Sequence, residues 1–218
     1  IKNASDKFSL SRDDMELSGA RIGSLLNELA DEGALNLIFS GGEAFLREDF
    51  FDLAFLAKSR NFAITIFSNG QLIDEDKAGR LADLSIVCIY FSLYGASPST
   101  HDRVTGVAGS FEKLLKALAL LKRKGVNVGL KTMLIRDNIF ELKEIYALGL
   151  SLGIEAHQFG EEITCRIDGS CSSKAVQLDE ALLYAYYRQE LPKPAEYMEE
   201  LPQEQARKKE LCSPGLSG

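Results

Sequence analysis

Residues 37–43 read Leu-Ile-Phe-Ser-Gly-Gly-Glu, and this stretch decides how the rest of the sequence is interpreted. Its three apolar residues predict a strand that is buried on both faces. The two glycines at the strand end carry no side chain, so they leave backbone N–H and C=O groups uncovered for a ligand. The carboxylate of Glu43 can pair with an ammonium group through a charge-assisted hydrogen bond. The same residues also fit a tight turn with a solvated glutamate, so the stretch alone leaves both interpretations open.

Strands and helices alternate along the rest of the chain. Apolar runs predict strands that start near residues 37, 63, 86, 126 and 154. Helical spacing and capping residues predict helices from a cap at Ser11 to Gly33, around 51–56, over about 74–84, from a cap at Ser110 to Gly125, over 142–153 and over 178–191. Residues 98–109 are expected to form a long polar connection and residues 161–176 a loop.

This order of elements favours an α/β fold with a parallel sheet. Each connection between strands is long enough to hold a helix, which makes neighbouring strands parallel. No G-x-G-x-x-G sequence opens any of the predicted helices, so a barrel or partial barrel fits better than a Rossmann sheet.

Polar residues follow the predicted strands where the strands end. Ser68-Asn69-Gly70 follows the strand over residues 63–67, and Ser92-Leu93-Tyr94-Gly95 follows the strand over residues 86–91. In barrel-like α/β folds the carboxyl ends of the strands carry the functional site. The sequence therefore predicts that these residues and Glu43 lie at one rim.

Composition excludes several classes of protein. The chain has 218 residues, of which 45% are hydrophobic and 26% charged, and its net charge is −7. This composition is typical of a soluble domain, and the absence of a basic stripe argues against nucleic acid and anionic membranes as partners. The chain shows no signal peptide and no apolar run long enough to span a membrane, and its four cysteines are too few for a disulfide framework. We therefore expect a cytoplasmic location.

Five groups of residues carry a resemblance to a known family. They are Gly41-Gly42-Glu43, Ser68-Asn69-Gly70, Ser92-Leu93-Tyr94-Gly95, His101-Asp102-Arg103-Val104-Thr105-Gly106 with Gly109-Ser110-Phe111, and Lys131-Thr132-Met133. Their order and spacing resemble the radical S-adenosylmethionine (radical SAM) enzymes. The fourth group is similar to the subgroup that modifies ribosomal peptides and carries a C-terminal SPASM extension. Cys212-Ser213-Pro214-Gly215 resembles the opening of that extension.

The resemblance implies a fold and a division of the chain. The expected fold is a parallel partial (β/α)6 barrel, apparently without its first strand. Residues 1–160 would form this barrel, and residues 161–218 would form a helical tail that leads into a truncated SPASM-like extension.

The resemblance also implies a cofactor site. Gly41, Gly42 and Glu43 would hold the amino group of SAM, and Ser92 would lie near the ribose or the carboxylate, as would Ser68 or Asn69. Arg103 and Lys131 are further candidates for the SAM carboxylate, and Cys212 is a candidate ligand of an auxiliary cluster.

The implied activity is a one-electron cleavage of SAM to a 5′-deoxyadenosyl radical that abstracts hydrogen from the substrate. This chemistry uses a [4Fe–4S] cluster that lies in the complete protein, and the cofactors carry it while the protein positions them. The partners would be a peptide or small-molecule substrate and an electron donor such as a flavodoxin or ferredoxin.

The cysteines depart from the family pattern. The family holds its cluster with a C-x-x-x-C-x-x-C loop upstream of the residues quoted above, and Cys88, Cys165, Cys171 and Cys212 do not have that spacing. The simplest expectation is that the first strand and the cluster loop precede Ile1, so that this chain alone is inactive. The alternative is a degenerate homologue.

Other interpretations remain open at this point. The chain could be a non-catalytic barrel that binds a peptide or nucleoside, whereas a phosphate-binding enzyme lacks support because no loop combines glycines with a Lys-Ser/Thr cradle. His101 fits a hydrogen bond at a helix start better than acid–base catalysis, and His157 fits a satisfied core histidine. Cys165 and Cys171 are expected to be free thiols.

Overall fold

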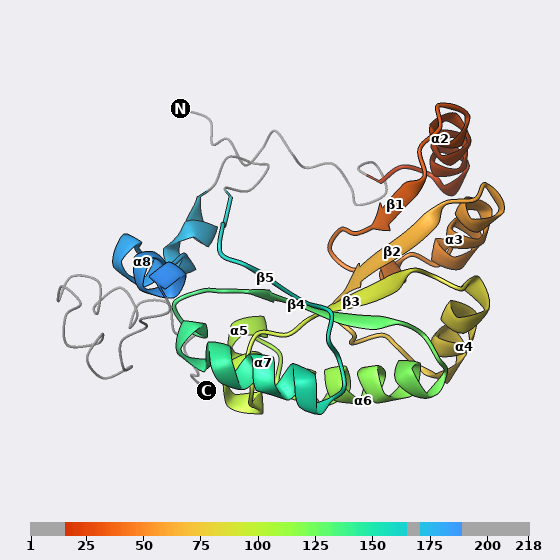
Figure 1. Ribbon diagram of the computed structural model, residues 1–218. Coiled ribbons are helices and arrows are strands. Elements are labelled where there is room, and N and C mark those ends of the chain that lie inside the picture. The colour runs from red at the N-terminus through yellow and green to blue at the C-terminus, as the bar shows by residue number, and fades with distance from the viewer. Residues whose placement is uncertain (1–15, 165–170, 189–218) are drawn as a thin grey trace, which may run out of the picture.

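The computed structural model describes residues 16–164 and 171–188 (Figure 1). In chain order its elements are α2 (Gly19–Asp31), β1 (Asn36–Phe39), η2 (Ala44–Leu46), α3 (Phe50–Ser59), β2 (Ala63–Ser68), α4 (Glu75–Leu84), β3 (Cys88–Ser92), α5 (Pro98–Thr105), α6 (Ser110–Arg123), β4 (Val128–Met133), η3 (Ile139–Glu141), α7 (Leu142–Ser151), β5 (His157–Gly160), η4 (Ser172–Val176) and α8 (Glu180–Arg188).

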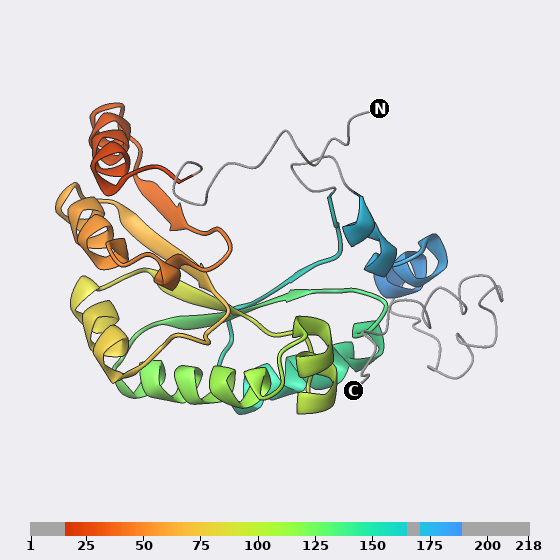
Figure 2. The same cartoon turned by 180° about the vertical axis from the view of Figure 1, so that it is seen from behind.

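The described strands form one five-stranded sheet in the order β1-β2-β3-β4-β5. Every neighbouring pair is parallel. The sheet is curved, and helices α3, α4, α6 and α7 lie along its outer side in both views (Figures 1 and 2). The predicted α/β fold with a parallel partial barrel is confirmed.

The two faces of the sheet differ because side chains alternate along each strand. Ile64, Ile66 and Ile89 point to the helices and are fully buried. They belong to the main apolar cluster, which continues into α4 and α6. The residues between them, such as Thr65 and Phe67, point to the concave side and are only half-buried. The concave side is therefore the face on which a ligand can lie.

Strand β1 corrects one expectation. Ile38 is 56% exposed, so β1 is not buried on both faces. The register pairs Ile38 with Thr65, which places Ile38 on the concave side, while Leu37 and Phe39 pair with Ile64 and Ile66 on the helix side. The strand also lies at an edge of the described sheet. An apolar run of three residues cannot reveal that position.

Two helix starts differ from the prediction. Helix α2 begins at Gly19, and the side chain of Ser18 caps it by accepting a hydrogen bond from the Arg21 N–H. Residues 16–18 lie outside any helix, and Ser11 falls outside the described residues. Ser110 is the first residue of helix α6 and does not cap it. Asp102 of the preceding helix caps it instead, because the Phe111 N–H donates to Asp102 Oδ1 at 2.9 Å.

The polar connection over residues 98–109 contains a helix that the sequence reading missed. Helix α5 has a proline in its first turn and ends at Gly106, which has a φ of +71°. Proline at a helix start and glycine just past its end are common terminal signals, because proline presets φ and glycine tolerates the left-handed region. Both signals are present in the sequence, but the segment is short and polar, so a connection was predicted in place of a helix.

The described residues around α8 pack against the segment that follows β4. Leu178 and Leu182 of the α8 region form a second buried cluster with Leu134 and Ile139, which follow β4. The predicted helix over 178–191 is described only as Glu180–Arg188, and Cys212 lies outside the described residues. Each helix in the described part of the chain is too short or too polar to cross a membrane.

Candidate functional site

Glu43 joins the end of β1 to the end of β2. Its Oε1 atom accepts from the Ser68 hydroxyl at 2.9 Å and from the Phe45 N–H at 3.3 Å, and its Oε2 atom accepts from the Asn69 N–H at 2.8 Å. No cation among the described residues forms an ion pair with this carboxylate. A carboxylate offers about four acceptor positions. Glu43 therefore has no cationic partner among the described residues and keeps one acceptor position open.

The two glycines before Glu43 present bare backbone. Gly41 has a φ of +144°, a region that side-chain-bearing residues rarely adopt. A Cβ atom built on Gly41 or on Gly42 meets no atom within 4 Å. The space beside both glycines is thus open, and a ligand with an ammonium group can approach the backbone and Glu43 together.

Ser92 and Lys131 lie side by side at the carboxyl ends of β3 and β4. They are Cα partners in the sheet register. The Lys131 ammonium lies 4.3 Å from the centre of the Phe67 ring, an arrangement in which the ring face attracts the cation. The structure therefore brings Glu43, Asn69, Ser92 and Lys131 to one rim, which confirms the predicted placement of these residues.

Arg103 is engaged elsewhere. Its guanidinium donates to the Asp137 carbonyl at 3.2 Å and lies 3.8 Å from the Asp137 carboxylate. The side chain is 55% exposed. Lys131 is thus the better placed of the two predicted cations for a group bound at the rim.

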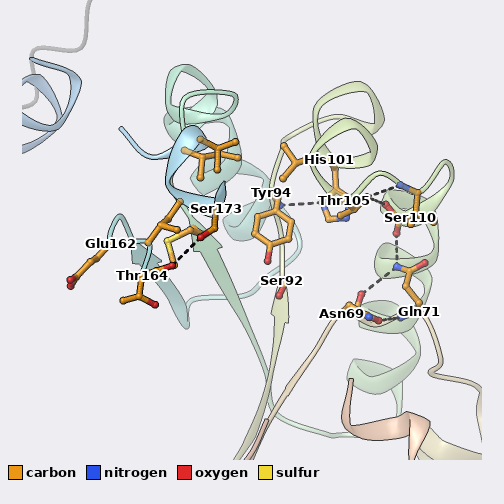
Figure 3. A pocket seen from close by; sticks show the side chains of 16 residues that line it. Asn69, Gln71, Ser92, Tyr94, His101, Thr105, Ser110, Glu162, Thr164 and Ser173 are labelled. Atoms are coloured by element: carbon orange, nitrogen blue, oxygen red, sulfur yellow. Dashed lines mark hydrogen bonds between the residues drawn. The ribbon is translucent and has the colours of Figure 1, made fainter. Parts of the chain in front are cut away.

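A cavity of about 810 Å³ opens beside the rim (Figure 3). Asn69 and Ser92 line it, together with residues that were not among the predicted cofactor contacts: Gln71, Tyr94, His101, Val104, Thr105, Val107, Ser110, Met133, Ile135, Glu162, Ile163, Thr164, Ser173 and Val176. Its volume lies within the usual range for small-molecule sites, about 300–1,000 Å³. The sequence signal for Gln71 and Tyr94 was their position in the loops after β2 and β3.

A hydrogen-bond network fixes one wall of the cavity. The Gln71 side-chain amide donates to the Ser110 carbonyl at 3.0 Å, and the Ser110 and Thr105 hydroxyls lie 2.8 Å apart. Asp102 accepts from the Gly109 and Phe111 N–H groups and from the Ser110 hydroxyl. The bond from Phe111 is the largest of the effects that hold the pKa of Asp102 below its usual range. This wall therefore presents neutral polar groups in fixed positions.

The two histidines lie in different environments. His101 is 1% exposed, and burial lowers its pKa, although the neighbouring Asp102 carboxylate opposes this. His157 lies on the helix side of β5, where its Nε2 atom is 2.8 Å from the Thr132 hydroxyl. Burial lowers the pKa of His157 to about 4. His157 is thus a core histidine, but the prediction that it is satisfied holds for Nε2 only, because Nδ1 is covered and has no hydrogen-bond partner among the described residues. His101, in contrast, lines the cavity.

The described residues offer no set of three or more side chains that could hold a metal ion. Cys88 is a buried free thiol, and burial raises its pKa. Cys171 is disulfide-bonded, so the expectation of a free thiol is wrong for this residue, and Cys165 lies outside the described residues. Thiolate ligands for an iron–sulfur cluster are therefore not assembled in the part of the chain that the structure describes.

The chain is similar to several curated proteins. The chain is 32% identical over 133 residues to Fe-coproporphyrin III synthase of Methanosarcina barkeri, covering 61% of this chain and 33% of that protein. It is 28% identical over 149 residues to PqqA peptide cyclase of Gluconobacter oxydans, covering 68% of this chain and 42% of that protein. The chain thus spans well under half the length of these curated relatives.

Solved structures share the fold. The structure titled native anSMEcpe with bound AdoMet and Kp18Cys peptide superposes with a TM-score of 0.58 at 18% identity, covering 81% of this chain and 55% of that one. The sequence profile of the Radical SAM superfamily matches residues 5–149. That range contains the Glu43 rim, the glycines and most of the cavity wall. The matched range covers more than half of the sequence, and the chain belongs to the Radical SAM superfamily.

Proposed function

We propose that this chain binds SAM across the rim and the adjoining cavity, as part of an enzyme that uses SAM for radical chemistry on a peptide or a small molecule. The methionine end would lie at Gly41, Gly42 and Glu43, and the nucleoside would lie in the cavity beyond Asn69 and Ser92. The observation that carries the proposal is the Glu43 carboxylate, which has no cationic partner among the described residues and lies beside open glycine backbone.

The residues of the rim suit the methionine end of SAM. The Glu43 carboxylate accepts from the ammonium group, and the hydrogen bonds from Ser68 and Asn69 hold that carboxylate in place. The Lys131 ammonium, steadied on the Phe67 ring, supplies the opposite charge for the methionine carboxylate. One negative and one positive group at the same rim match the zwitterionic amino-acid end.

The cavity suits the nucleoside end. Asn69, Ser92 and Thr105 provide neutral hydrogen-bonding groups, and residues such as Ile135 and Val176 provide apolar surface for a base. No lysine or arginine is among the described residues that line the cavity. A nucleoside without phosphates therefore fits better than a nucleotide.

The proposed reaction is reductive cleavage of bound SAM to a 5′-deoxyadenosyl radical, which abstracts hydrogen from the substrate. In this family an iron–sulfur cluster supplies the electron. The described residues do not offer the set of ligands that such a cluster needs. Peptide modification is the favoured outcome, because one relative is named for cyclising a peptide and one structural neighbour is titled with a bound peptide. A flavodoxin or ferredoxin in the cytoplasm would serve as electron donor.

Binding selectivity tests the SAM site. We expect calorimetric titration of the 218-residue chain to give one site for SAM and no measurable heat for ATP at the same concentrations. ATP carries three phosphate groups that the cavity lining does not neutralise. Equal binding of ATP and SAM would contradict the assignment of the cavity to a nucleoside.

The activity has its own test. After anaerobic reconstitution with iron and sulfide and reduction with dithionite, we expect no 5′-deoxyadenosine from the 218-residue chain. A gene product that also carries an upstream C-x-x-x-C-x-x-C segment is expected to form it. Product from the shorter chain would show that other residues hold the cluster.

The four cysteines in the sequence do not have the family spacing, which keeps a second candidate function in view. This is a non-catalytic barrel that binds a peptide or a nucleoside. A gene product that binds SAM, carries three upstream cysteines and still forms no 5′-deoxyadenosine would favour that function.

A further inference from the structure

His101 is held by one ring nitrogen only. The Tyr94 N–H donates to His101 Nδ1 at 3.1 Å (Figure 3). Gly95 allows this close fit, because a Cβ atom at that position would lie 2.6 Å from the His101 backbone nitrogen. The imidazole is therefore fixed in the wall where the loop after β3 meets helix α5.

The bond from Tyr94 sets the tautomer of the ring. A neutral imidazole has one donor and one acceptor nitrogen, and Nδ1 acts here as the acceptor. Burial favours the neutral form by lowering the pKa of His101. The single ring proton therefore resides on Nε2, which makes this atom a hydrogen-bond donor.

That donor has no partner in the described part of the chain. The structure shows a hydrogen bond to Nδ1 and none for Nε2. Nε2 is not completely covered by neighbouring atoms, so it remains accessible. Asp102, the nearest carboxylate in sequence, is already occupied by Gly109, Ser110 and Phe111. Because Nε2 is not sealed off, its proton can be donated to water or to a ligand in the cavity. A side chain that is 1% exposed, lines the cavity and carries an unpaired N–H points to a ligand acceptor.

We propose that His101 Nε2–H donates a hydrogen bond to an oxygen or ring nitrogen of the nucleoside that occupies the cavity. The proposal rests on the assignment of this cavity to the nucleoside part of SAM. The chemistry of the lining supports such a partner. The Tyr94 and Phe111 rings lie beside His101, and the Thr105 hydroxyl lies in the same wall. Glu162 is the one carboxylate in the described lining. His101 would thus be a ligand-contact residue with a fixed tautomer.

Two substitutions separate the contact from the anchoring of the loop. In His101→Asn the amide oxygen takes the place of Nδ1 and can still accept from the Tyr94 N–H, but nothing occupies the Nε2 position. In His101→Gln the amide lies near the Nε2 position and can donate into the cavity, but the Nδ1 acceptor is lost. The first variant removes the proposed ligand contact and keeps the anchor, and the second does the reverse.

Binding of 5′-deoxyadenosine to the 218-residue chain measures the contact. We expect His101→Asn to weaken binding by roughly 3- to 10-fold, the range for one neutral hydrogen bond, and His101→Gln to bind more tightly than His101→Asn. Thermal unfolding of both variants shows that the chain still folds. Repeating the titrations with 3-deaza, 7-deaza and 2′-deoxy analogues identifies the acceptor, because the analogue that lacks it is insensitive to His101→Asn.

Nuclear magnetic resonance gives a readout that does not depend on a variant. The chain has two histidines, so a nitrogen-15 imidazole spectrum contains two ring systems. We expect 5′-deoxyadenosine to shift the His101 Nε2 signal and to leave the His157 signals in place, because His157 lies on the opposite face of the sheet.

The outcomes are distinguishable. If the wild-type chain binds 5′-deoxyadenosine but neither His101 substitution nor any analogue changes the affinity, the His101 contact is wrong and the SAM site stands. If the wild-type chain binds neither 5′-deoxyadenosine nor SAM at millimolar concentration, both proposals are wrong.

Discussion

Replacing Glu43 with glutamine removes one charge at the point on which the proposed SAM site depends. Glutamine keeps the length of the side chain and one acceptor oxygen. That oxygen can still accept from the Asn69 N–H, and the new amide group can donate to the Ser68 hydroxyl. The contact that it cannot replace is the weaker one from the Phe45 N–H at 3.3 Å. The stability cost should therefore be small, about 1 kcal/mol for one neutral hydrogen bond.

The expected cost to SAM binding is larger. Three of the roughly four acceptor positions of the Glu43 carboxylate are occupied within the protein, which leaves one for the SAM ammonium. A hydrogen bond to a charged group contributes about 1.5–3 kcal/mol, so the dissociation constant should rise roughly 10- to 150-fold. Calorimetric titration of SAM measures this directly, and urea unfolding of the same samples measures the stability.

Glu141→Gln is the matched control. The Glu141 carboxylate also accepts from a backbone N–H, that of Ala96 at 2.9 Å, and from a hydroxyl, that of Thr100. It does not line the cavity. Glutamine can keep both contacts by the same exchange, so the control should lose no more stability than Glu43→Gln and should keep its affinity for SAM. Unchanged affinity in Glu43→Gln, or equal weakening in both variants, would remove Glu43 from the site.

Further predictions concern the core, the pH dependence and the concave side. Leu118→Ala should destabilise the chain by about 2–5 kcal/mol and leave SAM binding intact. Leu115→Ala should cost less stability, because Leu115 is only partly buried. Denaturant melts of both variants check which side chains of α6 face the core. Between pH 7.5 and 5 the unfolding free energy should fall by about 2 kcal/mol through His157 alone, because an unfolded histidine takes up its proton near pH 6.5 whereas folded His157 does so only near 4. The lowered pKa of His101 acts in the same direction, and a flat urea-melt series over this range would contradict the prediction. Gly129→Ala should cost about 1–3 kcal/mol, because its Cβ atom would lie 2.5 Å from Cε1 of Tyr90, and most of this cost should disappear in a Tyr90→Ala background.

The sheet and the rim were predictable because both follow from short-range patterns. Apolar runs that alternate with helical spacing require parallel strands, and parallel strands bring the residues after them to one end. The positions of Glu43, Asn69 and Ser92 followed from that geometry alone. The hydrogen bonds from Ser68 and Asn69 to Glu43 could not be predicted, because they depend on how the loop of Gly41 and Gly42 turns.

The cavity was not predictable from the sequence, because its walls come from segments that are far apart in the chain. Thr105 and Ser110 are brought to it by Asp102, which caps α6 from the preceding helix, and no local capping pattern indicates that. Ile163 and Val176 come from a stretch without helical or strand periodicity. The exposure of Ile38 likewise depends on the position of β1 at the edge of the described sheet, which the residues of the strand do not reveal.

A titration of SAM into the nitrogen-15-labelled chain, followed by backbone amide signals, tests the central claim most directly. If SAM lies across the rim and the cavity, the amides of Gly41 and Gly42 at one end and of Gln71 and Tyr94 at the other should shift together and give a single dissociation constant. Amides on the far helices, such as those of α4, should stay in place. Shifts confined to one of the two groups, or no shifts at millimolar SAM, would contradict the claim.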